Sequence, residues 1–285
     1  MRRSHFRPPD ILPASTPPPN ALQAAVITHL GAQAPRFVID WVDECVSTNT
    51  ALIENTPADD GRVHVLVAER QSAGRGRRGR QWQSWPDGSL TFSSVWHFAR
   101  GTPAPAGLSL VAGVAVARAL ERLGVVGLQL KWPNDVLVNG EKLVGILVEL
   151  STGRARGLAA VIGIGINLRL PPDVRIEAQA GVTDLAHALD GDVPGRPALL
   201  AALLAELDNL LATYASGGFP AVKGAWEQRN AFAELPVRIC GDEASLEGIC
   251  AGVDDDGALL LRTATGTQRI LAGDVSLRPL GGDAP

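Results

Sequence analysis

The sequence predicts an α+β fold, in which a large domain of helices on a mixed sheet precedes a small all-β unit. Up to about residue 233, short β-rich segments alternate with segments whose apolar residues recur at helical spacing. After Pro236 the helical spacing stops, and β-rich segments follow one another across Gly- and Asp-rich turns. The length of 285 residues fits one large domain plus one small one, and an apolar content of 46% is ample for a packed core.

The first 35 residues carry few signals of packed structure. Prolines are frequent there, with a run at Pro17–Pro19, and a single short helix is expected near Ala21–Leu30. We therefore expect a Pro-rich, poorly ordered arm over 1–35, a main domain over 36–233 and a small domain over 234–285.

The first half of the main domain is expected to contain one helix, two strands and a long loop. Ser47 precedes Thr48-Asn49 and an apolar triplet, which is typical of the N-cap of a short helix. Val63–Ala68 is rich in β-branched residues, and Ser89–Phe98 shows alternation with some β-branched residues, so both predict strands. Residues 71–88 are rich in Gly, Pro and Arg and form a loop.

The second half of the main domain is expected to hold three helices and four strands. Helical spacing predicts Leu108–Leu123, Leu199–Tyr214 and Ala221–Asn230 as helices. Two of the strands are almost wholly apolar, so we expect them to be buried on both faces. The expected strands are Leu128–Trp132, Val136–Val138, Leu143–Leu150 and Leu158–Asn167.

The C-terminal unit is expected to be a small SH3-like barrel. It spans about 45 residues, which is too few to enclose a large cavity. The expected strands are Val237–Cys240, Leu246–Val253, Ala258–Arg262 and Gln268–Leu271.

Composition excludes several classes of protein. A net charge of −4 argues against a basic nucleic-acid binder, so any positive site must be local. No run of about 18 apolar residues predicts a membrane span, and the Pro-rich start lacks a signal-peptide core. Three cysteines without C-x-x-C spacing indicate thiols in a reducing compartment, so we expect a cytoplasmic protein.

Lysine is scarce in this chain. Of 26 basic residues only three are Lys, namely Lys131, Lys142 and Lys223. Compositional bias alone can produce such an excess of Arg. A Lys is nevertheless informative here, because its compact ammonium has chemistry that a guanidinium lacks.

The segment Gly74–Arg80, with the sequence Gly-Arg-Gly-Arg-Arg-Gly-Arg, is the strongest functional signal. Backbone N–H groups and guanidinium forks suit a phosphate or a carboxylate. An RGG-like contact with nucleic acid and a solvated basic loop are the alternatives. The spacing is not that of a Walker A loop, and three Arg at the variable positions argue against a Rossmann fingerprint.

Two further segments combine polar groups with strand signals. Lys131–Asp135 reads Lys-Trp-Pro-Asn-Asp and ends a strand in a turn, although an ordinary turn with a hairpin tip at Asn139-Gly140 explains it equally well. In Gly163–Asn167, glycines lie inside an apolar strand. They either admit a ligand to the backbone or serve core packing.

Together these segments resemble the biotin protein ligases, which activate biotin with ATP and attach it to a lysine of a carrier protein. The resemblance covers about residues 40 to 280 and implies a ligase-type mixed-sheet domain with an SH3-like C-terminal unit. The matching segments, in chain order, are Ser47–Asn49, Gln71, Gly74–Arg80, Lys131–Asp135, Lys142–Leu147 and Gly163–Asn167.

The resemblance implies sites for two ligands and three catalytic residues. Lys142, Arg77 and Asp135 are the implied catalytic residues, and Asp135 either acts as a base in the second step or orients Lys131 and the turn. The residues implied for biotin are Ser47, Thr48, Asn49, Gln71, Arg75, Gly76, Arg77 and Lys142. The residues implied for the nucleotide are Arg77, Arg80, Trp82, Asn134, Lys142 and Asn167.

The implied reaction has two steps. The biotin carboxylate attacks the α-phosphorus of ATP, assisted by Mg²⁺ and fixed cations, which gives biotinyl-5′-AMP and pyrophosphate. A lysine of the carrier then attacks the mixed anhydride. The expected partner is the biotin carboxyl carrier protein of acetyl-CoA carboxylase or a related carboxylase.

Other readings and partners can be weighed against this one. A lipoate ligase or octanoyl transferase would share the catalytic fold. We expect no role with DNA, because some relatives use an N-terminal domain for repression and the Pro-rich residues before Ser47 are too few for a winged helix. We expect no membrane partner, no metal ligands among the side chains, and a monomer or homodimer.

Overall fold

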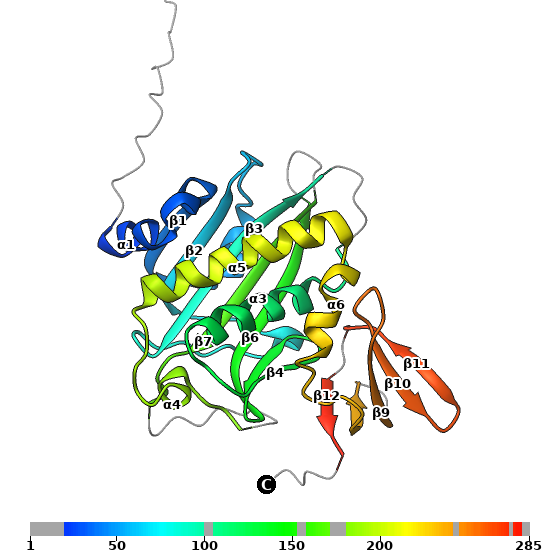
Figure 1. Cartoon of the computed structure of the whole chain (residues 1–285). Helices are drawn as coiled ribbons and strands as arrows, with labels where there is room; N and C mark the ends of the chain where they lie inside the picture. The colour runs from blue at the N-terminus through cyan, green and yellow to red at the C-terminus, as the bar shows by residue number, and fades with distance from the viewer. Residues whose placement is uncertain are drawn as a thin grey trace, which may run out of the picture.

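The computed structural model describes residues 20–99, 105–152, 158–171, 181–241, 245–273 and 276–280 (Figure 1). Its largest element is a seven-stranded sheet. The strands are β1 (Phe37–Cys45), β2 (Val63–Gln71), β3 (Ser89–Phe98), β4 (Leu128–Lys131), β5 (Asp135–Val138), β6 (Glu141–Thr152) and β7 (Leu158–Asn167).

The order across this sheet is β1-β2-β3-β7-β6-β5-β4. β1 and β2 run parallel, whereas the other neighbours are antiparallel, so the predicted mixed sheet is confirmed. β7 is buried along almost its whole length, because its apolar residues meet helices on one face and the site on the other.

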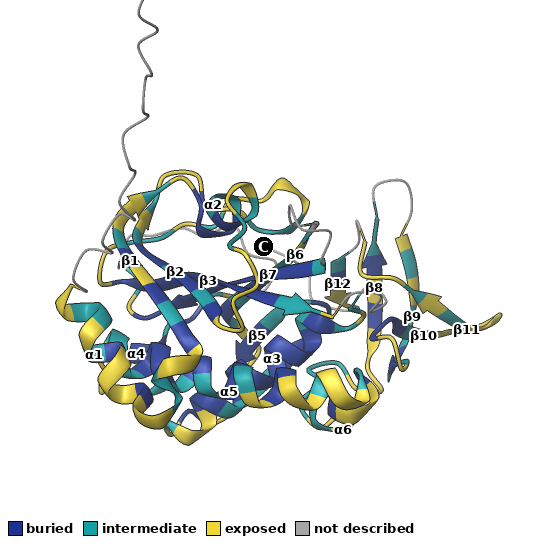
Figure 2. Ribbon diagram, turned by 90° about the horizontal axis from the view of Figure 1, so that it is seen from above, coloured by how far each residue is buried: buried dark blue, intermediate teal, exposed yellow. Residues whose placement is uncertain are grey.

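Helices cover the two faces of the sheet unequally. Figure 2 shows α1, α3 and α5 on one side of the sheet and α2 on the other. α3 is apolar on nearly every side and lies in the core, where it packs on α5. The helices are α1 (Ala21–Leu30), α2 (Thr48–Glu54), α3 (Leu108–Arg122), α4 (Leu185–Ala188), α5 (Arg196–Gly217) and α6 (Pro220–Glu227).

Among the described residues, α5 has the length and apolar composition to cross a membrane, with a mean hydropathy of 1.4. Half of the residues in its most apolar stretch are buried inside the fold. Leu203 and Leu207 on this helix are fully buried, and α5 packs against α1, α3 and α6. Its hydrophobic character is therefore that of a core helix.

The N-terminal segment is more ordered than expected. α1 has the predicted bounds and begins with a capping box, in which Asn20 and Gln23 bond each other's backbone N–H. Val26 is fully buried, and a 3₁₀ helix, Gly31–Arg36, leads into β1. Residues 20–35 are thus ordered, with the expected helix and a further 3₁₀ helix, while residues 1–19 lie outside the described part. The other domain limits stay predictions.

The C-terminal unit is a five-stranded antiparallel sheet in the order β11-β10-β9-β8-β12. This arrangement is consistent with the expected small barrel, and it contains one strand more than predicted. The strands are β8 (Pro236–Cys240), β9 (Ser245–Val253), β10 (Leu259–Thr263), β11 (Gly266–Ile270) and β12 (Ser276–Pro279).

The two units meet at the turn between β4 and β5. The indole N–H of Trp132 donates to the carbonyl of Gly257 over 3.1 Å, and both groups are buried. Gly257 has φ +78° and lies so close to Gly107 that a Cβ would come within 2.7 Å of the Gly107 Cα. The C-terminal unit therefore packs directly against the segment that carries the Lys-Trp-Pro-Asn-Asp motif.

Candidate active site

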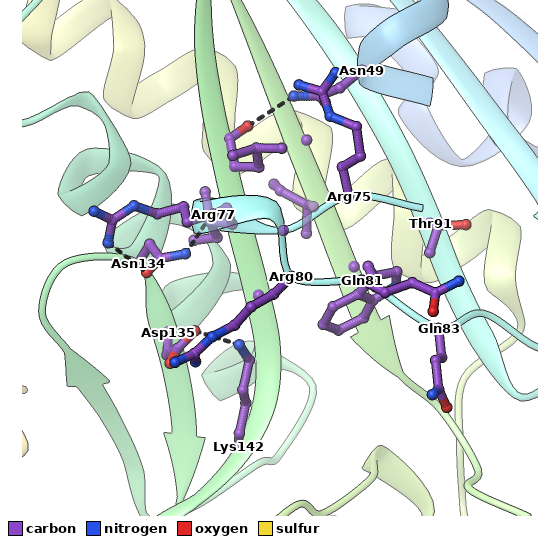
Figure 3. A pocket seen from close by; sticks show the side chains of 18 of the residues that line it. Asn49, Arg75, Arg77, Arg80, Gln81, Gln83, Thr91, Asn134, Asp135 and Lys142 are labelled. Carbon is purple, nitrogen blue, oxygen red and sulfur yellow. Dashed lines mark hydrogen bonds and ion pairs between the residues drawn. The ribbon is translucent and has the colours of Figure 1, made fainter. Parts of the chain in front are cut away.

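A cavity of about 870 Å³ opens on the face of the main sheet that carries α2. Every residue that the sequence analysis assigned to biotin, nucleotide or catalysis lines it. The segments come from the start of α2, the loop after β2, the β4–β5 turn, and strands β6 and β7 (Figure 3). Sequence-distant motifs are thus brought to one site.

One end of the cavity is formed where two parallel strands finish together. β1 ends at Cys45 opposite Gln71 of β2, so Gln71 meets the first turn of α2. Ser47 is the N-cap of α2. The Gln71 Oε1 accepts the backbone N–H of Thr48 over 2.8 Å and lies 3.2 Å from the Thr48 Oγ1. These contacts orient a set of hydroxyl and amide groups toward the cavity.

A second polar layer lies behind this one and includes residues that the sequence analysis did not single out. Asn49 Nδ2 donates to Glu149 over 2.9 Å, and the other Glu149 oxygen pairs with Arg75. Asn49 Oδ1 accepts from Ser93 over 2.5 Å. Ser93 and Glu149 stand alone in the sequence on β3 and β6, and only strand pairing brings them together.

The Arg-rich loop forms a tight hairpin over the cavity. Gly76 N–H donates to the carbonyl of Arg80 over 2.7 Å, and Trp82 N–H donates to that of Gly74 over 2.9 Å. A Cβ on Gly74 would come within 2.4 Å of the Trp82 carbonyl oxygen, which explains that glycine. The loop is therefore held by backbone bonds, and its arginine side chains line the cavity.

Arg77 links this loop to both units of the molecule. Its guanidinium donates to the carbonyls of Ala272 and Gly273 in the C-terminal unit and lies 3.4 Å from the Asn134 Oδ1 (Figure 3). Asn134 is itself fixed, because its Nδ2 donates to the Ile146 carbonyl over 2.7 Å.

The glycines of β6 and β7 make room for an indole. A Cβ on Gly165 would come within 2.2 Å of the Trp82 ring, and one on Gly145 within 2.9 Å. The two glycines therefore admit the Trp82 indole, a side chain of the protein itself, to the backbone of the sheet. Gly163 has the same function for Asn49, whose Oδ1 would lie 2.2 Å from a Cβ there.

The other end of the cavity carries an ion pair. Lys142 Nζ lies 2.6 Å from Asp135 and 5.9 Å from the centre of the Trp82 ring (Figure 3). The Asn139-Gly140 turn between β5 and β6 places both residues of this pair on neighbouring strands. A cation is thus held close to the loop that carries Arg77 and Arg80.

Lys131 is a cavity residue to which the sequence analysis gave no ligand role. Its side chain is 8% exposed and lines the cavity beside Asp135. Burial lowers the pKa of the Lys131 ammonium from its ordinary 10.5, and the attraction of Asp135 offsets this only in part. The motif was visible in the sequence, but the burial depends on the tertiary fold.

Asn167 lines the cavity with its amide already engaged. Its Nδ2 donates to the Thr183 carbonyl over 3.1 Å, and the residue is buried.

Within the described ranges, no three His, Cys, Asp or Glu side chains come together as a metal site of the protein would require. Asp135 is the carboxylate nearest the cationic end.

The fold and the cavity define a ligase-type domain with a C-terminal β unit, and two family models match the chain. The biotin/lipoate A/B protein ligase family matches residues 44–167, and the biotin protein ligase C-terminal domain matches residues 236–278. The first match contains the cavity motifs, and the second contains the five-stranded unit.

Individual relatives narrow this class. A biotin–[acetyl-CoA-carboxylase] ligase of Paracoccus denitrificans is 39% identical over 239 residues, which are 80% of this chain and 96% of that protein. The bifunctional ligase/repressor BirA of Escherichia coli is 36% identical over 214 residues, and the chain spans 66% of its length. The chain belongs to the biotin protein ligase family.

Solved structures agree with this assignment. The biotin protein ligase from Aquifex aeolicus in complex with biotin and ATP superimposes with a TM-score of 0.73 at 32% identity. The superposition covers 85% of this chain and 99% of that one.

Proposed function

We propose that the chain activates biotin with ATP to biotinyl-5′-AMP and transfers the biotinyl group to a lysine of a biotin carboxyl carrier protein. The observation that carries the proposal is a single cavity with a buried hydroxyl-and-amide end and a cationic end. The name of the Paracoccus denitrificans relative and the ligands of the Aquifex aeolicus structure support it.

The cavity suits a ligand with a polar ring at one end and a carboxylate at the other. The ring head belongs at Ser47, Thr48 and Gln71, where hydrogen-bonding groups are concentrated. An aliphatic chain would run beside the Trp82 indole toward Lys142. Asn49 and Asn167 already bond to the protein, so we propose supporting roles for them.

The first step joins two anions, so the protein must supply positive charge. ATP carries about −4 and the carboxylate −1. Arg77, Arg80 and Lys142 line the end of the cavity where they would meet, and Gly76 offers close approach to the backbone. Mg²⁺ would arrive with ATP and be held mainly by the phosphates, where it would neutralise charge on the leaving pyrophosphate.

The second step needs a neutral amine. A free lysine with a pKa of about 10.4 is about one part in a thousand neutral near pH 7.4. Asp135 is the candidate base for that proton. Its ion pair with Lys142 favours an orienting role in the ligand-free protein, and the lysine that it orients is Lys142 rather than Lys131.

The remaining expectations are part of the proposal. We propose a cytoplasmic enzyme that acts on the carrier of acetyl-CoA carboxylase or a related carboxylase, as a monomer or homodimer. We propose no DNA-binding role and no membrane partner.

Biotin-dependent exchange of pyrophosphate into ATP tests the first step. Lys142→Gln should lower the exchange rate by about 10²–10³-fold, because it removes a cation from the developing charge at the α-phosphate. Lys223→Gln is the matched control. Lys223 lies on α6, outside the cavity, and pairs with Asp255 of the C-terminal unit. Absence of biotin-dependent exchange in the parent protein would overturn the proposed function.

A further inference from the structure

Glu149 is a charged residue of β6 that binds to two residues at the polar end of the cavity. One of its carboxylate oxygens pairs with Arg75, and the other accepts from Asn49 Nδ2 over 2.9 Å. The Glu149 side chain is 26% exposed. A half-buried carboxylate with two donors is a strong and fixed acceptor.

Glu149 determines which way the Asn49 amide points. The Asn49 Nδ2 lies near two groups that can only accept, the Glu149 carboxylate and, at 3.3 Å, the Leu147 carbonyl. The amide oxygen must therefore face Ser93. Gly163 lies directly beneath this oxygen, so the amide is confined against β7.

The orientation of the Asn49 amide determines where the Ser93 hydroxyl hydrogen points. Ser93 Oγ lies 2.5 Å from Asn49 Oδ1 and 2.6 Å from Thr48 Oγ1, but a hydroxyl has one hydrogen. Asn49 Oδ1 cannot donate, so the Ser93 hydrogen belongs to that contact. The contact between Ser93 and Thr48 then requires the Thr48 hydrogen.

The Thr48 hydroxyl has a second, more distant acceptor in Gln71. Gln71 Oε1 accepts the Thr48 backbone N–H, which fixes it as the amide oxygen, and it lies 3.2 Å from the Thr48 Oγ1. This contact is longer than the 2.6 Å contact with Ser93, so the Thr48 hydrogen goes to Ser93 as long as Asn49 holds the Ser93 hydrogen. Toward the cavity, Thr48 can then only accept a hydrogen bond.

We propose that Glu149 is a positioning residue that sets the direction of this hydrogen-bond chain, so that the Thr48 hydroxyl accepts an N–H from the ligand. The inference rests on the proposed function and adds a source of specificity to it. The urea ring of biotin has N–H donors, whereas a fatty acyl chain has none. Without Glu149, the longer Leu147 contact alone holds the Asn49 amide, which can then reverse and donate to Ser93. The Ser93 hydrogen can then go to Thr48, and the Thr48 hydrogen keeps only the 3.2 Å contact with Gln71 and becomes available to the ligand.

The test compares biotin with the two analogues in which one urea N–H is replaced by a ring oxygen. Isothermal titration of the full chain should show that the parent binds one analogue at least ten-fold more weakly than biotin, because an acceptor would face an acceptor. Glu149→Leu should weaken biotin binding about ten-fold and reduce this discrimination to about three-fold or less.

Further variants separate the effect of the hydrogen-bond chain from that of the Glu149–Arg75 ion pair. Ser93→Ala interrupts the hydrogen-bond chain and leaves the Glu149–Arg75 ion pair intact. It should therefore reduce discrimination between biotin and the analogue as Glu149→Leu does. Glu149→Gln keeps an acceptor for Asn49 and should retain most of the discrimination. Glu247→Gln, which breaks a Glu–Arg pair in the C-terminal unit, should change neither ligand's affinity.

The role is also visible in kinetics. In pyrophosphate exchange, Glu149→Leu should raise the KM for biotin about ten-fold and change kcat less than about three-fold, because the reacting end is untouched. Unchanged discrimination in both Glu149→Leu and Ser93→Ala would overturn the inference alone. Failure of the parent to bind biotin would overturn the proposed function and this inference with it.

Discussion

Lys131 is a largely buried cation in the lining of the cavity, where it is 8% exposed. No hydrogen bond or ion pair to its ammonium occurs within the part of the chain that the structure describes. Burial is the main cause of its lowered pKa, and Lys142, Arg80 and Arg278 act in the same direction. Such a group lowers the stability of the ligand-free protein and is suited to an anionic ligand.

Replacing Lys131 should therefore stabilise the ligand-free protein. Because the folded pKa lies below the unfolded one, the unfolded chain binds more protons between the two values, and stability rises with pH across that window. The gain from Lys131→Met should be greatest near pH 7 and decrease as the pH approaches 10.5. Urea unfolding between pH 7 and pH 10 measures it.

A matched lysine provides the control for this prediction. Lys223 pairs with Asp255 over 3.0 Å and is partly exposed, so Lys223→Met should give no stabilisation at any pH. A loss of stability in Lys131→Met at pH 7 would contradict the prediction.

At the level of elements, β7 makes room for Trp82 because Gly165 has no side chain. Gly165→Ala would place a Cβ within 2.2 Å of the Trp82 ring and must displace the indole. We expect biotin affinity to fall about ten-fold or more while the sheet still forms, with a stability loss of about 1–3 kcal/mol. Titration calorimetry and thermal unfolding measure the two effects.

The control for this substitution lies in α6. Gly224 has an ordinary helical backbone, and no atom lies within 4 Å of the position that a Cβ would take there. Gly224→Ala should stabilise the protein by about 0.5–1 kcal/mol and leave affinity unchanged. Normal biotin binding in Gly165→Ala would show that Trp82 has no part in the site.

Elements with a continuous apolar pattern were predictable from the sequence. β7 has the expected bounds because burial on both faces leaves an almost unbroken apolar signal, and β3 has them because apolar and β-branched residues recur along it. β1 was missed because Asp40, Asp43 and Glu44 interrupt its pattern on the exposed side. β12 was missed because its four residues are stabilised by pairing with β8, which is distant in sequence.

In the site too, residues in contiguous motifs were predictable from the sequence, whereas isolated residues were not. Contiguous motifs such as Gly74–Arg80 identified its main parts, through their resemblance to a known family. Ser93 and Glu149 have no local signal, since each is a single polar residue in a strand. Their positions depend on the register between β3, β7 and β6, which the sequence alone does not state.

The molecule as a whole depends on the contact between its two units. Gly257→Ala would collide with Gly107 and disturb the carbonyl that accepts from Trp132, next to the site turn. We expect a stability loss of about 2 kcal/mol or more and reduced pyrophosphate exchange. Differential scanning calorimetry and the exchange assay measure these effects.

Gly266→Ala is the matched control in the same unit. Gly266 also has a positive φ, of +122°, but nothing lies within 4 Å of its Cβ position. Its substitution should cost about 1 kcal/mol of backbone strain and leave exchange unchanged. Equal effects of the two substitutions would show that the contact between the units is unimportant for the site.

The scarcity of lysine would suit the proposed formation of an acylating intermediate. The proposed product reacts with any accessible neutral amine, and the chain offers three side-chain amines. Lys131 and Lys142 line the cavity itself, whereas Lys223 lies outside it; Lys142 and Lys223 are each 27% exposed in ion pairs with carboxylates. The 23 arginines provide positive charge for phosphates without offering a nucleophile, because a guanidinium stays protonated. Outside the cavity, the lysine of the proposed carrier would therefore meet little competition from side-chain amines of this chain.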